Sequence, residues 1–195
     1  MSKGIGEKLK NTIINTLRGT REITTETIGL LTNTVKSAFE GVSDIFESSF
    51  KIALEAIKGA MEGVSEVGIT VVEAVSKLVS STIKGVFQAG GDVIQATRGA
   101  VQGVIQRTAE TGGDVGQVAV SAVRSAIRTA GEVGGDVGKV TREAIITAVE
   151  SADQISDTVG KTVRDALSGA IEGAKDIIAS VATKKEEKEE ERKNP

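Results

Sequence analysis

The sequence predicts an all-α protein of long amphipathic helices, because it contains an internal repeat and its apolar residues follow a helical spacing. The tetrapeptide Gly-Gly-Asp-Val occurs at residues 90–93, 112–115 and 134–137 of the 195-residue chain, at intervals of 22 residues. Division into 22-residue units from Ser2 gives eight units in one register without a gap. Within a unit, apolar or small residues recur mostly three and four positions apart, which is the spacing of a helix face rather than of a strand.

Two columns of the repeat form the predicted apolar face. The twelfth and sixteenth positions of the unit are apolar in all eight units. Because each unit also divides into halves of 11 residues, at about 3.67 residues per turn, the stripe runs almost straight along the helix. The candidate apolar face consists of Ile13, Leu17, Val35, Phe39, Ile57, Met61, Val79, Ile83, Val101, Ile105, Val123, Ile127, Ile145, Val149, Leu167 and Ile171.

A second stripe of the repeat is made of small residues. Positions 14 and 18 of the unit carry Gly, Ser, Thr or Asn in every unit except the fifth, where Arg107 stands at position 18. Small residues four apart form a groove that lets another helix backbone approach closely. We therefore expect close helix–helix contacts along this groove, whose glycines are Gly19, Gly41, Gly59, Gly63, Gly85, Gly169 and Gly173.

The Gly-Gly-Asp sites are compatible with two arrangements of the helices. Gly commonly ends a helix and Asp caps the next one, which would give antiparallel helices of about 19 residues. The equivalent positions 46–48, 68–70 and 156–158 lack the double glycine, which is compatible with a helix that runs through them. We expect an intermediate, an antiparallel or elongated bundle in which 2–89 and 156–183 are the longest uninterrupted stretches. The candidate hinges are Gly90, Gly91, Gly112, Gly113, Gly134 and Gly135.

Glycine makes an isolated helix of this sequence unstable. Each Gly inside a helix costs about 0.8–1.0 kcal/mol relative to Ala, so most of the 23 glycines together cost on the order of 15–20 kcal/mol. The apolar face of the repeat region, residues 2–183, must therefore be covered by another segment, another copy or a lipid surface. Residues 184–195 contain five basic, five acidic and no apolar residues, and we expect them to form a charged, solvated tail.

The composition excludes several functional classes. Without Cys or His the chain has no disulfide, no thiol nucleophile, no imidazole base and no zinc finger. A net charge of −3 without a basic segment argues against nucleic-acid binding. Residues 160–162, Gly-Lys-Thr, resemble the end of a phosphate-binding loop, but the glycine required five residues earlier is Ile155. We predict no catalytic, cofactor-binding or metal-binding residues, no enzyme activity and no small-molecule substrate.

No segment is typical of a secretory signal or a transmembrane helix. The first ten residues carry Lys3, Glu7, Lys8 and Lys10 and contain no apolar region of the kind that signal peptides use. No stretch approaches the roughly 20 apolar residues that span a bilayer. We therefore expect a cytoplasmic protein, at most peripheral to a membrane or an inclusion surface.

The 11- and 22-residue columns resemble those of known lipid-surface helices. Together with the segments Glu172-Gly173-Ala174 and Glu40-Gly41-Val42, they make the chain similar to apolipoproteins, perilipins and synucleins. The chain lacks the Pro that punctuates apolipoprotein repeats and the Lys-rich core of synuclein repeats. Late-embryogenesis-abundant proteins share the period but are more hydrophilic than this chain, whose mean hydropathy is −0.02. The Gly-Gly-Asp-Val units also resemble uncharacterised bacterial repeat proteins.

This resemblance implies a structural protein that binds a surface. We expect the amphipathic helix to adsorb to a lipid, membrane or storage-granule surface and to associate with other copies of itself, forming a homo-oligomer. The alternative is a self-assembling helical bundle, coiled coil or filament without lipid. A third hypothesis is a stress-protectant protein that is disordered until it dries or binds.

Overall fold

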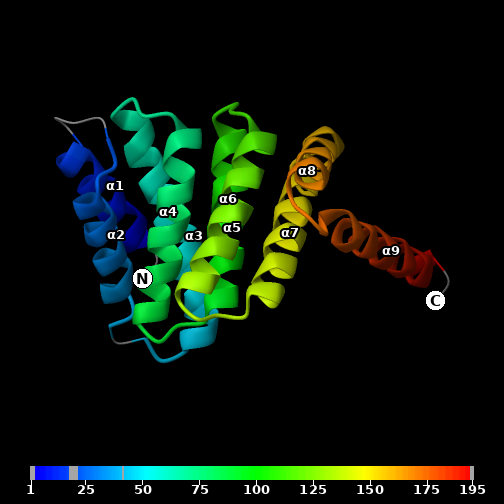
Figure 1. The fold of residues 1–195 in the computed structure, drawn as a ribbon, viewed down its shortest axis with the longest axis horizontal. Helices are drawn as coiled ribbons and strands as arrows, with labels where there is room; N and C mark the ends of the chain where they lie inside the picture. The colour runs from blue at the N-terminus through cyan, green and yellow to red at the C-terminus, as the bar shows by residue number, and fades with distance from the viewer. Residues whose placement is uncertain (1–2, 18–21, 41, 194–195) are drawn as a thin grey trace.

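The computed structural model describes residues 3–17, 22–40 and 42–193, and every regular element within these ranges is an α-helix. The elements in chain order are α1 (Lys3–Leu17), α2 (Thr25–Ser37), α3 (Ile45–Glu66), α4 (Val71–Gln88), α5 (Val93–Glu110), α6 (Val115–Glu132), α7 (Val137–Asp153), α8 (Asp157–Ala170) and α9 (Ala174–Lys193). The chain is therefore all-α, as its repeat predicts. Successive helices run back and forth across the molecule (Figure 1).

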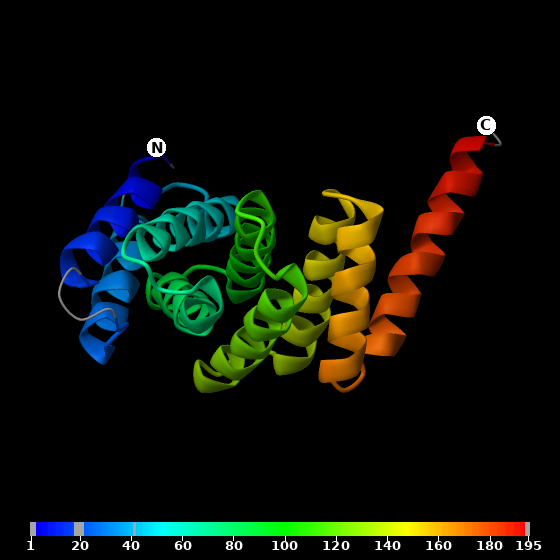
Figure 2. The same cartoon turned by 90° about the horizontal axis from the view of Figure 1, so that it is seen from above.

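The helices form two layers. From α1 to α6, each helix contacts the next helix and, more extensively, the helix after that. The helices α1, α3, α5 and α7 therefore stack in one layer, and α2, α4, α6 and α8 stack in the other (Figure 2). This is the arrangement of an α-solenoid, in which neighbouring helix pairs bury a shared core. Helix α9 contacts α7 and α8 and extends away from the stack (Figure 1).

The Gly-Gly-Asp sites lie in short turns between helices. Gly90 has a φ of 77°, a left-handed conformation that costs Gly little, and the next amide, of Gly91, donates to the carbonyl of Val86 at 2.9 Å. The carboxylate of Asp92 then accepts the N–H of Gln95 at 2.8 Å and caps α5. Each residue of the motif thus ends one helix or begins the next. The same arrangement recurs at Gly112, Gly113 and Asp114 and at Gly134, Gly135 and Asp136.

The expectation of uninterrupted helix over residues 2–89 and 156–183 is wrong. Helices within those stretches end at Leu17, Ser37, Glu66 and Ala170. The double glycine is not required for a break, because a single glycine or a polar cap is sufficient. Gly68 and Gly173 adopt positive φ, and the side chain of Asp44 accepts the N–H of Glu47 to begin α3.

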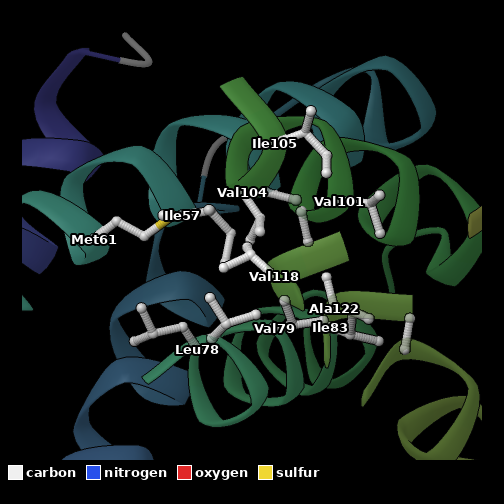
Figure 3. Packing of buried hydrophobic residues seen from close by; sticks show 14 of the residues in the cluster. Ile57, Met61, Leu78, Val79, Ile83, Val101, Val104, Ile105, Val118 and Ala122 are labelled. Carbon is white, nitrogen blue, oxygen red and sulfur yellow. The ribbon is translucent and has the colours of Figure 1, made fainter. Parts of the chain in front are cut away.

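The predicted apolar face forms the core between the layers. Phe39, Ile127 and Ile171 are partly buried against this core, and the other residues of the candidate apolar face are at most 1% exposed. Figure 3 shows how Ile57 and Met61 of α3 lie near Leu78 of α4. The side chains that would insert into a lipid surface are therefore covered by the chain's own helices.

Ion pairs connect helices within each layer. Lys84 of α4 binds Glu132 of α6 at 2.7 Å, and in the other layer Lys10 of α1 lies 2.9 Å from Glu62 and 2.5 Å from Glu66 of α3. Hydrogen bonds to the carboxylates of Glu66 and Glu62 raise the pKa of Lys10, and the bond from Lys84 lowers the pKa of Glu132. These exposed pairs help to fix the register of the stack and contribute little to its stability.

Candidate functional site

The small-residue groove lies between helices of the same layer. A Cβ added at Gly63 of α3 would lie 2.8 Å from the carbonyl oxygen of Lys10 on α1, and one at Gly85 of α4 would lie 2.7 Å from that of Thr32 on α2. A Cβ at Gly59 would overlap the backbone of Gly6. Each of these glycines therefore lets a helix sit directly on the backbone of the helix two before it.

Hydroxyl side chains take the place of glycine farther along the groove. Ser125 Oγ of α6 donates to the carbonyl of Ser76 on α4 at 2.7 Å, and the hydroxyls of Thr129 and Ser80 lie 3.0 Å apart. Both groove residues are at most 1% exposed. The groove thus continues as polar contacts between α4 and α6.

Other predicted groove residues lie elsewhere. A Cβ at Gly169 would meet no described atom within 4 Å, and Gly173 lies in the turn before α9 with a φ of 75°. Gly19 and Gly41 lie outside the described residues. Gly99 and Gly103 of α5, which the sequence reasoning missed, lie against the backbone and side chains of α3. Gly103 occupies position 14 of its unit, so the column itself could have identified it.

Large apolar side chains outside the core are the features that the repeat does not explain. None of the four Phe is fully buried, and Phe46 and Phe87 are 59% and 44% exposed. Leu30 and Ile45 are also more than 40% exposed. Aromatic side chains are normally used for burial, and exposed ones are typical of binding surfaces. Three of the Phe lie between residues 39 and 50, at the junction of α2 and α3.

The α2–α3 junction departs from the repeat at both of its helix ends. Helix α2 ends at Ser37, seven positions earlier in the unit than α3 to α6 end. Helix α3 begins at Ile45, whereas α4 to α7 all begin at the fourth position of a unit. The connection 38–44 is consequently longer than the connection 89–92. The connection is longer because α2 ends seven positions early, whereas α3, capped by Asp44, begins only four positions early. Phe46 occupies a column that holds Gly, Ser or Thr in the other seven units.

An open cleft of about 810 Å³ lies at this junction. It forms because α2 barely contacts α3, unlike the other successive helices. We call it the α2–α3 cleft, and its lining is Gly4, Ile5 and Lys8 of α1, Leu30, Asn33, Thr34 and Ser37 of α2, Ala38, Glu40, Val42 and Ser43 of the connection, and Ser48, Lys51 and Ile52 of α3. Its volume lies in the range of ligand-binding clefts, and its lining is part apolar and part polar.

The rim of the cleft carries residues 44–47, the extra first turn of α3, which we call the 44–47 turn. Asp44 caps it by accepting the N–H of Glu47 at 3.0 Å, and Glu47 pairs with Lys51 one turn later. The buried hydroxyl of Ser49 donates to the carbonyl of Ile45 at 2.6 Å and accepts the N–H of Asp92 at 2.9 Å. These bonds tie the turn to the junction of α4 and α5, so that the exposed side chains of Ile45 and Phe46 project from a well-supported base.

The cleft lining carries apolar, hydroxyl and charged side chains. Lys8 and Lys51 lie on its lining with one carboxylate, that of Glu40. Among the described residues no group of His, Cys, Asp and Glu could hold a metal ion.

Comparison with known proteins gave no match, either to a protein-family model or to a curated protein. Within the part of the chain that the structure describes, no helix is both long and apolar enough to cross a bilayer. Function is therefore inferred from the geometry of this chain.

Proposed function

We propose that this chain is a non-enzymatic structural protein, a helical-repeat scaffold that associates with further copies of itself. One observation carries the proposal: the repeated apolar columns are closed into an internal core, while Ile45 and Phe46 at the α2–α3 junction stay exposed beside an open cleft. A chain whose repeat face is already covered needs no lipid to fold. The apolar side chains that remain exposed are then available for a protein contact.

Binding to a lipid surface is the competing proposal, and the glycine content of the helices favours it. Glycines inside helices weaken each helix, so the stack could open at a surface that offers an alternative cover for the apolar columns. Such binding would require the core to separate, because Ile57, Val101 and Ile145 are 0% exposed. The closed core therefore argues against lipid binding through these columns.

Far-UV circular dichroism with and without vesicles separates the two proposals. The scaffold proposal expects strong helicity in buffer at low micromolar concentration, unchanged by vesicles of phosphatidylcholine and phosphatidylglycerol. Light scattering coupled to gel filtration should then give a mass above that of one 20.1 kDa chain. Weak helicity that rises sharply with vesicles would instead support surface binding, and a strictly monomeric protein would exclude the scaffold proposal.

A further inference from the structure

We propose that the α2–α3 cleft receives the 44–47 turn of a second copy of this chain, so that two copies exchange turns about a two-fold axis. This inference rests on the proposed self-association and names its interface. Ser43 and Ser48 line the cleft and directly flank the turn in the sequence, so projection and cleft share one rim. A two-fold axis beside this rim places each turn over the other copy's cleft, which is the self-complementary geometry of a closed dimer.

The turn does not fill its own cleft. Ile45 and Phe46 are absent from the lining and are 45% and 59% exposed. The cleft beneath offers Ile5 and Ile52, both buried, and the half-exposed Leu30 as apolar contacts. Insertion would therefore cover exposed apolar side chains on both partners, and an aromatic residue held in a pocket is the commonest kind of binding hot spot.

Charge favours the same pairing. Glu47 of the turn and Lys51 of the cleft lining pair within one chain, so Asp44 is the further carboxylate of the turn, and the lining carries Lys8 and Glu40 besides Lys51. Lys8 is exposed on α1. In the exchanged dimer the acidic turn of each copy approaches the Lys8 side chain of the other, which favours this orientation over others.

The size of the surface suits a stable dimer. The fourteen lining residues and the four residues of the turn give eighteen residues on each copy. Standard protein interfaces use about 20–30 residues a side and bury about 800 Å² on each partner. The number of residues in the exchange therefore lies just below the lower end of that range.

The first test compares two exposed phenylalanines. Phe46→Ser removes the inserted side chain, and Phe87→Ser, at the end of α4, is the matched control because Phe87 is also exposed but lies outside the 44–47 turn. Sedimentation equilibrium of the full chain should show a dimer that Phe87→Ser leaves intact. Loss of a hot spot weakens binding at least about 25-fold, and a two-fold dimer loses it twice, so Phe46→Ser should raise the dissociation constant on the order of 600-fold.

The outcomes separate this inference from the proposed function. An oligomer that is equally stable in both variants overturns the exchange and leaves self-association standing. A wild-type chain that is monomeric at all concentrations overturns both. A monomer that binds phosphatidylcholine vesicles through Phe46 assigns the cleft to lipid and also overturns the exchange. Circular dichroism of each variant checks that its helicity is unchanged, as expected for exposed positions.

A second test traps the exchanged pair directly. Because the chain has no Cys, substituted thiols are the only ones present. Chains carrying Ile45→Cys, which keep Phe46, are mixed with chains carrying Leu30→Cys and oxidised, and the exchange predicts a mixed disulfide between them. The control mixture replaces Ile45→Cys with Phe87→Cys. Equal cross-linking in both mixtures overturns the inference, because a disulfide requires Cα atoms about 4.4–6.8 Å apart.

Discussion

Substitution of Gly59 by Ala tests the close packing of α1 against α3. A Cβ at Gly59 would overlap the backbone of Gly6 on α1, and a backbone cannot rotate aside as a side chain does. Overpacking of this kind costs about 1–3 kcal/mol, and we place this site at the upper end. Ala gains about 1 kcal/mol over Gly in a helix interior. The net expectation is a loss of about 2 kcal/mol, or about 4–8 °C in melting temperature for a chain of this size.

The matched control is Gly29→Ala in the middle of α2. A Cβ there would meet no described atom within 4 Å, and Gly29 is exposed. Only the helix propensity remains, so this variant should gain about 1 kcal/mol and melt about 2–4 °C higher. The two Gly→Ala substitutions are chemically identical and should shift the melting temperature in opposite directions.

The terminal position of α1 adds a second readout. In a stacked repeat protein an end helix can detach while the remaining helices stay folded. Gly59→Ala should therefore accelerate amide hydrogen exchange across α1, residues Lys3–Leu17, before it affects α5 or α6. If Gly59→Ala instead raised the melting temperature as Gly29→Ala does and left exchange in α1 unchanged, the contact of α1 with α3 would be refuted.

Three further predictions concern turns, caps and pH. Gly112→Ala should destabilise the chain by about 1–2 kcal/mol in urea unfolding although the site is open, because Gly112 has a φ of 68°. Asp114→Ala should cost about 1 kcal/mol in the same assay, since its carboxylate caps α6 through the N–H of Gln117. The N–H of Lys139 lowers the pKa of Asp136 from 3.8, and Lys84 lowers that of Glu132 from 4.5. The two ionised carboxylates therefore contribute their full stabilisation when the pH lies above these ordinary pKa values, and they lose it as the pH falls through the lowered pKa values. The melting temperature should be constant from pH 7 to 5 and should fall below about pH 4. In the Asp136→Asn variant the melting temperature should fall less over the same acidic pH range.

The core could be predicted from the sequence because a repeat makes each column visible eight times. Ile57, Val101 and Ile145 occupy one column, and all three are 0% exposed. What covers the column could not be predicted, because periodicity describes a face and not its partner. A lipid surface, another chain and the next helix of the same chain all require the same apolar spacing.

The helix ends were harder to predict than the core. Only the double glycine was expected to break a helix. The single Gly68 also ends α3, through the same kind of hydrogen bond, from the N–H of Ile69 to the carbonyl of Val64. The cap at Asp44, which sets the start of α3 without any glycine, was also not expected. Local side-chain caps of this kind decide where a helix begins, and the hydrophobic pattern contains no trace of them.

Gly173→Leu and Gly63→Leu should have different effects although both glycines belong to the predicted groove. A groove contact would make Gly173→Leu equivalent to Gly63→Leu, which forces a side chain against Lys10 and Ile13 of α1. Gly173 instead has a φ of 75° and no described atom within 4 Å of an added Cβ. Leu there would strain the turn before α9 without touching the stack, so the two substitutions report on different features.

The position of the candidate site follows from the regularity around it. In a repeat protein every regular junction presents nearly the same surface, so a specific contact must come from a departure from the repeat. The junctions at 90–92, 112–114 and 134–136 share one turn and one cap. The α2–α3 junction has an Asp cap as well but lacks the double-glycine turn, and it alone among the eight units places a Phe at the first position, where it is 59% exposed beside an open cleft. A large apolar side chain that is exposed to water lowers solubility and does not stabilise the monomer. A contact with a second copy of the chain gives a physical reason for Phe46 to be exposed at this position.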